Sequence, residues 1–139
     1  MTDKVHYLDL ADFLLIGEAV LQVRAEVLVL QCDLHLADSA LNAPRARFGG
    51  VEFYPDFANK AAILCWHLIR NHPLPDGNKR TAYLCLTEFV ERNSYIWVPP
   101  IGDPGGDQTV EMMVEIADDK VSVEKLTDWV VERLSVSPD

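Results

Sequence analysis

The stretch NHPLPDGNKRTA, residues 71–82, places a histidine, a carboxylate and two cations around one tight turn. The Pro-Asp-Gly sequence at 75–77 favours a turn, because proline fixes φ and glycine accepts the positive φ that other residues avoid. The amides around Asn78 and Lys79 would then point into one concavity at the start of a helix, and Arg80 adds a second full positive charge. We therefore expect an anion site that suits phosphate.

Two further side chains extend this chemistry. Asp76 lies beside the expected anion site, where a carboxylate repels phosphate unless a divalent cation stands between them. His72 precedes the turn, and a histidine can take a proton from a hydroxyl nucleophile near neutral pH. The combination suggests a magnesium-nucleotide site and a phosphoryl or nucleotidyl transfer.

The residue types alone also fit a simpler interpretation. A polar connection between two helices commonly contains Pro, Asp, Gly and Asn. In that case His72 satisfies carbonyls at the end of the preceding helix, while Lys79 and Arg80 are solvated cations. Composition and spacing leave both interpretations open.

The elements before the turn read mainly as helices. Apolar residues recur at helical spacing within 8–30, which predicts one or two helices, the first capped by Asp9 or Asp12. A short helix is predicted around 38–43. The sequence RFGGVEFYP that follows at 47–55 has paired glycines between β-prone residues and predicts a small hairpin or an extended flap.

Two helices are predicted on either side of the turn. Asp56 is a candidate N-cap for a buried helix over 57–71, whose apolar face carries Phe57, Ala61, Leu64, Cys65 and Leu68. That helix must stop before Pro73. A second helix resumes with KRTAYLCLTEFVERN, where the helical periodicity is carried by Leu84, Phe89 and Val90. The turn is therefore expected to be a helix–loop–helix junction.

The last third of the chain predicts one long loop and two helices. Residues 97–108 are rich in proline and glycine and are expected to form a loop. Helices are predicted over 109–119 and 122–134, the second capped by Ser122. The predicted fold class is mainly α, with at most one small hairpin, and residues 1–139 are expected to form a single domain.

Charge and hydropathy exclude some classes of function. The formal net charge is −10, from 22 acidic and 12 basic residues, which argues against non-specific binding to nucleic acid or to an anionic membrane. The chain starts without a basic region followed by an apolar stretch, and its longest apolar run, AAILCW, is too short to cross a bilayer. We expect a cytoplasmic protein without a membrane segment.

Other side chains that can do chemistry give weaker patterns. Cys32, Cys65 and Cys85 are widely spaced among apolar neighbours, which predicts buried thiols rather than a disulfide framework or a zinc site. His67 lies five residues before His72, which is the wrong spacing for two ligands on one helical face. The tryptophans fit core or boundary packing better than a base-stacking platform.

The order of the residues in HPLPDGNKR resembles the signature loop of the Fic/Doc family, whose pattern runs His-Pro-Phe-x-Asp/Glu-Gly/Ala-Asn-Gly/Lys-Arg. The sequence is most similar to the Doc ("death on curing") branch. That similarity extends from Ala46 to Tyr95 and includes Phe-Gly-Gly and Tyr-Pro landmarks upstream of the loop. The resemblance implies a Fic-type helical bundle with a small β-hairpin flap.

The resemblance also implies roles for individual residues. His72 would be the catalytic base, and Asp76 would hold Mg²⁺. Gly77 and Asn78 would shape the anion hole, while Lys79 and Arg80 would contact the phosphates of ATP. The flap would dock a segment of the target, by adding a strand, through the residues Phe48, Gly49, Gly50, Val51, Glu52, Phe53 and Tyr54.

Three positions depart from the family patterns. Leu74 replaces the aromatic residue of the loop and should still be buried there. The adenylyl-transferring Fic branch has Gly after the Asn and a second Arg three residues beyond the first, where this chain has Lys79 and Tyr83. The resemblance to Doc implies a reversed nucleotide, with the γ-phosphate facing the hydroxyl, and so favours a kinase. The alternatives are AMP transfer and a catalytically inactive binding module.

The resemblance further implies a biological setting. The target would be a Thr or Ser hydroxyl of a translation factor, with elongation factor Tu expected, so that translation and growth stop. The chain would be the toxin of a toxin–antitoxin pair, held by a Phd-like antitoxin whose disordered tail folds on it. Self-inhibiting Fic proteins carry a Ser/Thr-x-x-x-Glu-Gly/Asn motif. The nearest match here, Thr87–Arg92, ends in arginine, so we expect inhibition in trans.

Overall fold

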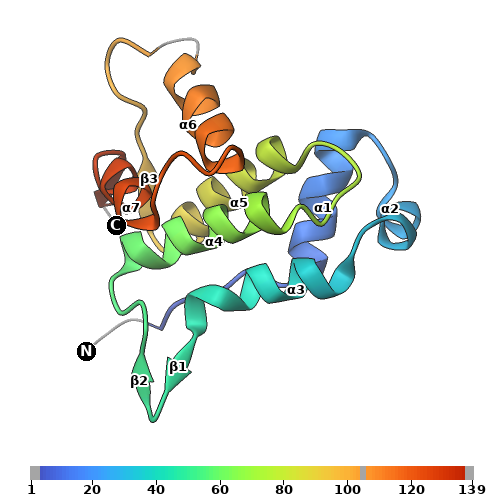
Figure 1. The fold of residues 1–139 in the computed structure, drawn as a ribbon, viewed down its shortest axis with the longest axis horizontal. Coiled ribbons are helices and arrows are strands. Elements are labelled where there is room, and N and C mark those ends of the chain that lie inside the picture. The colour runs from blue at the N-terminus through green and yellow to red at the C-terminus, as the bar shows by residue number, and fades with distance from the viewer. Residues whose placement is uncertain (1–3, 104–105, 137–139) are drawn as a thin grey trace.

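The computed structural model describes residues 4–103 and 106–136. Within these ranges, seven α-helices, one 3-10 turn and four short strands form a mainly α fold around α4 (Figure 1). In chain order they are α1 (Leu10–Leu21), α2 (Ala25–Gln31), α3 (Leu34–Asn42), η1 (Ala43–Arg45), β1 (Arg47–Phe48), β2 (Val51–Glu52), α4 (Phe57–Asn71), α5 (Asn78–Arg92), β3 (Tyr95–Trp97), α6 (Asp107–Ala117), α7 (Val123–Val131) and β4 (Leu134–Val136).

Helix α4 is the centre of the fold and packs against α3, α5, α6 and α7. Six consecutive residues, Lys60–Cys65, are buried, so the helix is covered on more than one side. The helix has the bounds that the sequence predicts. Asp56 occupies the N-cap position, although its side chain makes no capping hydrogen bond there.

Helix α5 runs beside α4 and continues the chain after the turn. It begins at Asn78, and Phe89 and Val90 are fully buried, as the apolar periodicity predicts. Leu84 does not belong to this buried face, because 38% of it is exposed. The buried residues Thr81, Cys85 and Phe89 recur four positions apart along one face of the helix, and Leu84 lies outside that face.

The N-terminal helices cover the same core. Both predicted caps of α1 are used: the Asp9 carboxylate accepts the Asp12 amide, and the Asp12 carboxylate accepts the Asp9 amide, each at 2.9 Å. The chain then forms two helices, because Gln22 ends α1 in a left-handed conformation. The helix predicted around 38–43 is longer and starts at Leu34, because Asp33 caps it.

Two pairs of antiparallel strands complete the described part of the fold. Strands β1 and β2 form the expected hairpin, with Gly49 and Gly50 at positive φ in its turn. A second antiparallel pair, which the sequence did not predict, joins β3 to β4 near the other end of the chain. The last predicted helix was therefore too long: α7 ends at Val131, and Leu134 already lies in β4.

Three smaller predictions concern the loop and the buried groups. The expected loop at 97–108 is shorter at both ends, because β3 includes Trp97 and α6 starts at Asp107, and residues 104–105 lie outside the described residues. Cys65 and Cys85 are buried thiols and Cys32 is half-buried. None of the described helices has the length and hydropathy of a membrane span.

Candidate functional site

The turn between α4 and α5 opens into a cleft of about 720 Å³, which we call the motif cleft. All six of the loop residues with predicted roles lie on its wall. The complete lining is Val20, Leu21, Ile69, His72, Pro75, Asp76, Gly77, Asn78, Lys79, Arg80 and Ala117. The two ends of the junction, α1 and the last residue of α6 therefore enclose one site around the histidine, the carboxylate and the two cations.

His72 stands where α4 ends, in a left-handed conformation with φ +50°. Residues other than glycine rarely adopt this conformation, so neighbouring contacts must hold it. Helix α3 supplies two: the Asp33 amide donates to the Pro73 carbonyl at 2.8 Å, and the Asn71 side chain donates to the Leu36 carbonyl at 3.0 Å. These contacts fix the backbone on both sides of an exposed imidazole.

Asn78 closes the loop by a two-point clamp. Its side-chain oxygen accepts the Leu74 amide and its side-chain nitrogen donates to the Leu74 carbonyl, both at 2.9 Å. Leu74 itself is 2% exposed, so the leucine at the usual aromatic position is buried, as predicted. The clamp satisfies two backbone groups that would otherwise be buried without partners.

Gly77 allows the loop to approach α1 closely. Its φ is +71°, and a Cβ atom there would lie 2.8 Å from Leu21 Cδ2 and 3.2 Å from Val20 Cγ1. No side chain caps α5, whose first backbone bond is donated by Thr81 to the Gly77 carbonyl. Within the described residues, the three amides that precede Thr81 have no acceptor, so the start of α5 offers a group of donors to an anion.

The cations at the start of α5 are exposed and form no ion pair with any described residue. In a chain of net charge −10, Lys79 and Arg80 thus concentrate positive charge at one place. Arg80 can bind two phosphate oxygens at once through its planar guanidinium. The loop sequence predicted this concentration, and the structure adds that both side chains face the motif cleft.

A second pocket of about 570 Å³, the α5–α6 pocket, shares Lys79 and Arg80 with the motif cleft. Its other lining residues are Tyr83, Pro99, Asp103, Gly106, Thr109, Val110, Met113 and Val114. Tyr83 is oriented by the Trp97 indole, which donates to its hydroxyl at 2.8 Å. No local sequence pattern indicates this pocket, because its walls come from segments that only the tertiary fold brings together.

Among the residues that the structure describes, Asp76 is the one carboxylate on the wall of the motif cleft. One of its oxygens accepts the Gly77 amide at 2.8 Å. The described residues include no cluster of three or more metal-ligating side chains. This arrangement fits Mg²⁺ that arrives with a nucleotide, since Mg²⁺ is commonly held by one or two carboxylates together with substrate phosphates and water.

The structure does not bring the hairpin to the motif cleft. Residues 48–54 lie at the start of α4, whereas His72 follows its last residue (Figure 1). A helix of 15 residues is about 22 Å long. No hairpin residue lines the motif cleft, so the two predicted parts of the site form separate surfaces. The hairpin side chains Phe48, Val51 and Phe53 are largely exposed.

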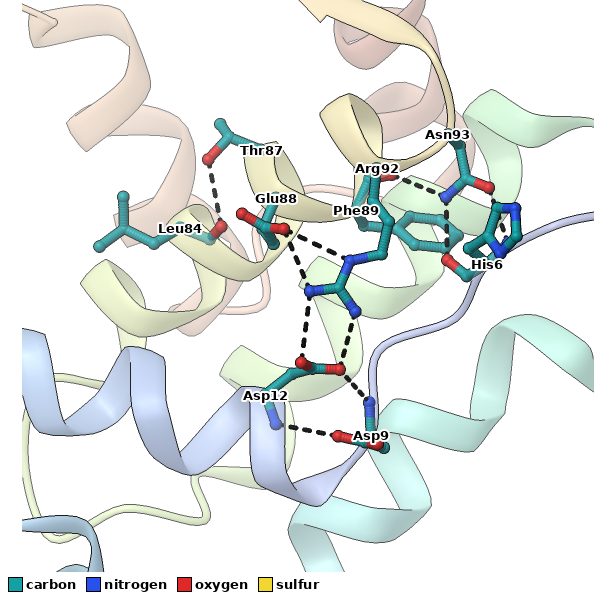
Figure 2. A network of polar contacts seen from close by, with 9 residues as sticks. All are labelled: His6, Asp9, Asp12, Leu84, Thr87, Glu88, Phe89, Arg92 and Asn93. Atoms are coloured by element: carbon teal, nitrogen blue, oxygen red, sulfur yellow. Dashed lines mark hydrogen bonds and ion pairs between the residues drawn. The ribbon is translucent and has the colours of Figure 1, made fainter.

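The far end of α5 holds a polar network (Figure 2). Arg92 donates to both oxygens of Asp12 at 2.9 and 3.2 Å and to Glu88 at 3.1 Å. Asn93 donates to the carbonyls of His6 and Phe89. The segment Thr87–Arg92 belongs to this end of the helix, so it takes no part in the motif cleft.

Comparison with known proteins agrees with the loop pattern. A sequence model described as the Fic/DOC family matches residues 6–90, which is more than half of the chain. A protein named Toxin Doc, from Mycolicibacterium smegmatis, is 37% identical over 111 residues, and the aligned region covers 80% of this chain and 80% of that protein. The family match includes α4, the turn and α5 as far as Val90, and so contains all the loop residues that line the motif cleft.

Proposed function

Because this chain belongs to the Fic/DOC family, we propose that it is a Doc-type toxin that transfers the γ-phosphate of ATP to a protein hydroxyl. Members of this family are typically enzymes that transfer nucleotide or phosphate groups to proteins, and they generally use ATP with a divalent cation. The observation that carries the proposal is the motif cleft, where His72, Asp76 and the cationic start of α5 meet.

The proposed reaction uses these groups as follows. His72 removes the proton of a threonine or serine hydroxyl, whose oxygen attacks the γ-phosphorus. The bond from that phosphorus to the bridging oxygen breaks, and ADP leaves with its electron pair. The amides at the start of α5, with Lys79 and Arg80, stabilise the charge on the phosphate oxygens. Asp76 would hold Mg²⁺, which would supply further positive charge to the phosphates.

Two side chains favour a kinase over an adenylyltransferase. Lys79 stands where the adenylyl-transferring pattern has glycine, and Tyr83 stands where that pattern has a second arginine. The Tyr83 hydroxyl accepts a hydrogen bond from Trp97, and Tyr83 lines the α5–α6 pocket. Tyr83 therefore supplies no positive charge for a terminal phosphate. We infer that the γ-phosphate lies at the His72 side of the cations.

Labelled ATP separates the two reactions. Purified protein is incubated with elongation factor Tu and with ATP labelled at either the α- or the γ-phosphate. We expect label from the γ-phosphate on elongation factor Tu with the wild-type protein. We expect none with His72→Ala, which removes the base. Label from the α position would identify AMP transfer and overturn the kinase assignment.

The third candidate, an inactive binding module, predicts a different result in cells. If the chain acts only by binding, wild type and His72→Ala slow growth equally when expressed. The proposed enzyme stops growth only with His72 in place. His35→Ala is a suitable control, since His35 is exposed on α3 and lines neither the motif cleft nor the α5–α6 pocket.

The proposed partners follow from the relative named Toxin Doc. We infer that a Phd-like antitoxin blocks the motif cleft in trans and that elongation factor Tu is the target. Both interactions would take place in the cytoplasm. The hairpin side chains Phe48 to Tyr54 remain a proposed docking surface. Because that surface lies at the opposite end of α4 from His72, it would contact the body of a large target rather than the segment that carries the hydroxyl.

A further inference from the structure

Lys60 is a buried lysine that the proposed reaction does not use. Only 2% of it is exposed, and it lies in the first turn of α4. A buried ammonium group is costly, and an apolar side chain of similar length would fill the same space at lower cost. The charge at this position therefore needs an explanation other than core packing.

The partners of Lys60 come from three separate segments. Its Nζ lies 2.8 Å from Glu52 Oε1 in β2 and donates to the Pro44 carbonyl in η1 at 3.2 Å. The ring of Tyr7, from the N-terminal segment, lies 5.8 Å from the same nitrogen. The ammonium group of Lys60 thus connects α4 to η1, which precedes the hairpin, and to β2, the second strand of the hairpin.

Few other contacts hold the hairpin. Its two strands pair with each other, and the Phe53 amide donates to the Ala46 carbonyl at 3.0 Å within the same segment. Arg47 approaches Glu52 only to 3.9 Å and is itself largely exposed. The hydrogen bond and the charge of Lys60 lower the pKa of Glu52, so its carboxylate stays ionised to lower pH than an ordinary glutamate.

We propose that Lys60 is a positioning residue that fixes the hairpin to α4. The exposed apolar side chains Phe48, Val51 and Phe53 are then held at one end of the helix, in a constant orientation to His72 at the other end. A protein substrate would then contact two surfaces, the hairpin and the motif cleft, that keep a fixed position relative to each other. The part of the inference that concerns the substrate rests on the proposed function.

The structural part is tested with Lys60→Met, which keeps most of the volume and removes the charge. We expect amide hydrogen exchange in the hairpin, at Phe53 and Val51, to become about tenfold faster or more, because a hydrogen bond to a charged group is lost. The urea midpoint of unfolding should change little, because Glu52, the partner that remains charged, is half-exposed and can be hydrated. Lys125→Met, at an exposed position of α7, is the matched control.

Unchanged hairpin exchange in Lys60→Met would overturn the proposal. If that variant loses stability throughout the chain instead, Lys60 is a general core residue and the proposal is likewise wrong. Glu52→Gln is a second test of the Lys60–Glu52 pair, because Glu52 is half-exposed and its replacement opens no cavity. It should speed exchange at the same two amides, since it removes the charge from the same pair.

The functional part is tested by phosphorylation of elongation factor Tu. Lys60→Met should raise KM for the protein substrate while kcat and KM for ATP stay at the wild-type values. A loosened hairpin with unchanged KM for the factor would refute the role in docking. If the wild-type chain transfers no phosphate to the factor, the proposed function fails there, and the exchange measurements still decide whether Lys60 fixes the hairpin.

Discussion

The geometry of His72 depends on residues that the loop pattern does not contain. Asn71 and Asp33 connect the end of α4 to α3, and they hold the backbone on both sides of a left-handed histidine. Asn78 then ties the loop to itself through Leu74. The placement of the base is therefore a property of the surrounding helices as much as of the loop sequence.

Gly77→Ala should destabilise the protein more than Gly49→Ala. Both glycines have positive φ, which costs other residues about 1–2 kcal/mol. Only at Gly77 would the new Cβ meet another side chain, at 2.8 Å from Leu21, whereas Gly49 has open space. Overpacking of this kind adds about 1–3 kcal/mol. Urea unfolding measures the difference, and equal losses for the two variants would contradict the close approach.

Asn78→Ala should destabilise the loop between α4 and α5. It removes both bonds to Leu74 and leaves a buried amide and carbonyl without partners, which we expect to cost about 2–4 kcal/mol of unfolding free energy. Asn42→Ala is the matched control, because that exposed side chain only bonds the Asp38 carbonyl on the surface of α3. Chemical denaturation compares the two, and similar small losses would refute the clamp.

At the scale of elements, α4 connects the two surfaces of the molecule. Its first turn holds Lys60 beneath the hairpin and its last residue precedes His72. Helix α5 carries the cations at its start and, at its far end, the Arg92 network that binds α1. The motif cleft therefore lies at the junction of two adjacent helices, with His72 and Asp76 in the turn itself and Lys79 and Arg80 in the first turn of α5.

The sequence predicts these two helices well because their patterns are strong. The bounds of α4 follow from a long apolar segment between a candidate cap at Asp56 and Pro73. Strand β4 was missed because three residues carry too little periodicity, and its partner β3 lies far away in the sequence. The distance between the hairpin and the motif cleft is likewise tertiary information, which no local pattern contains.

The ion pair between Asp12 and Arg92 should make stability depend on acid pH. Burial of Asp12 raises its pKa, but the hydrogen bonds from Arg92 and Asp9 outweigh that effect and leave the pKa lowered. A carboxyl with a lowered pKa stabilises the fold above its ordinary pKa of about 4, and this contribution is lost as the pH falls through the folded-state value.

Wild type should thus exceed Asp12→Asn by about 1–2 kcal/mol near neutral pH. The difference should shrink between about pH 5 and about pH 2 in urea titrations. Asp128→Asn, at an exposed position of α7, controls for the loss of one negative charge. A difference that stays constant down to the lowest pH would show that the pair does not titrate as described.

At the scale of the whole molecule, the positive charge of the motif cleft contrasts with a net charge of −10. Lys79 and Arg80 act locally, since charges further than about 8 Å apart are largely screened at physiological ionic strength. The acidic remainder of the surface repels polyanions such as nucleic acid.

Arg80→Ala should weaken ATP binding about tenfold to a hundredfold, since a bidentate charged contact contributes about 1.5–3 kcal/mol. Isothermal titration with Mg-ATP measures the loss. Arg24→Ala is the control, because that exposed side chain pairs with Glu26 in α2 and does not line the motif cleft. Equal affinities for wild type and Arg80→Ala would remove Arg80 from the proposed nucleotide site.

The proposed reaction is the transfer of a phosphate group from ATP, in the motif cleft, to a translation factor. Tandem mass spectrometry of elongation factor Tu, isolated from cells arrested by this chain, tests it most directly. We predict a phosphate on a threonine or serine of the factor, absent when His72→Ala is expressed. Unmodified factor from arrested cells, or AMP in place of phosphate, would rule out this reaction.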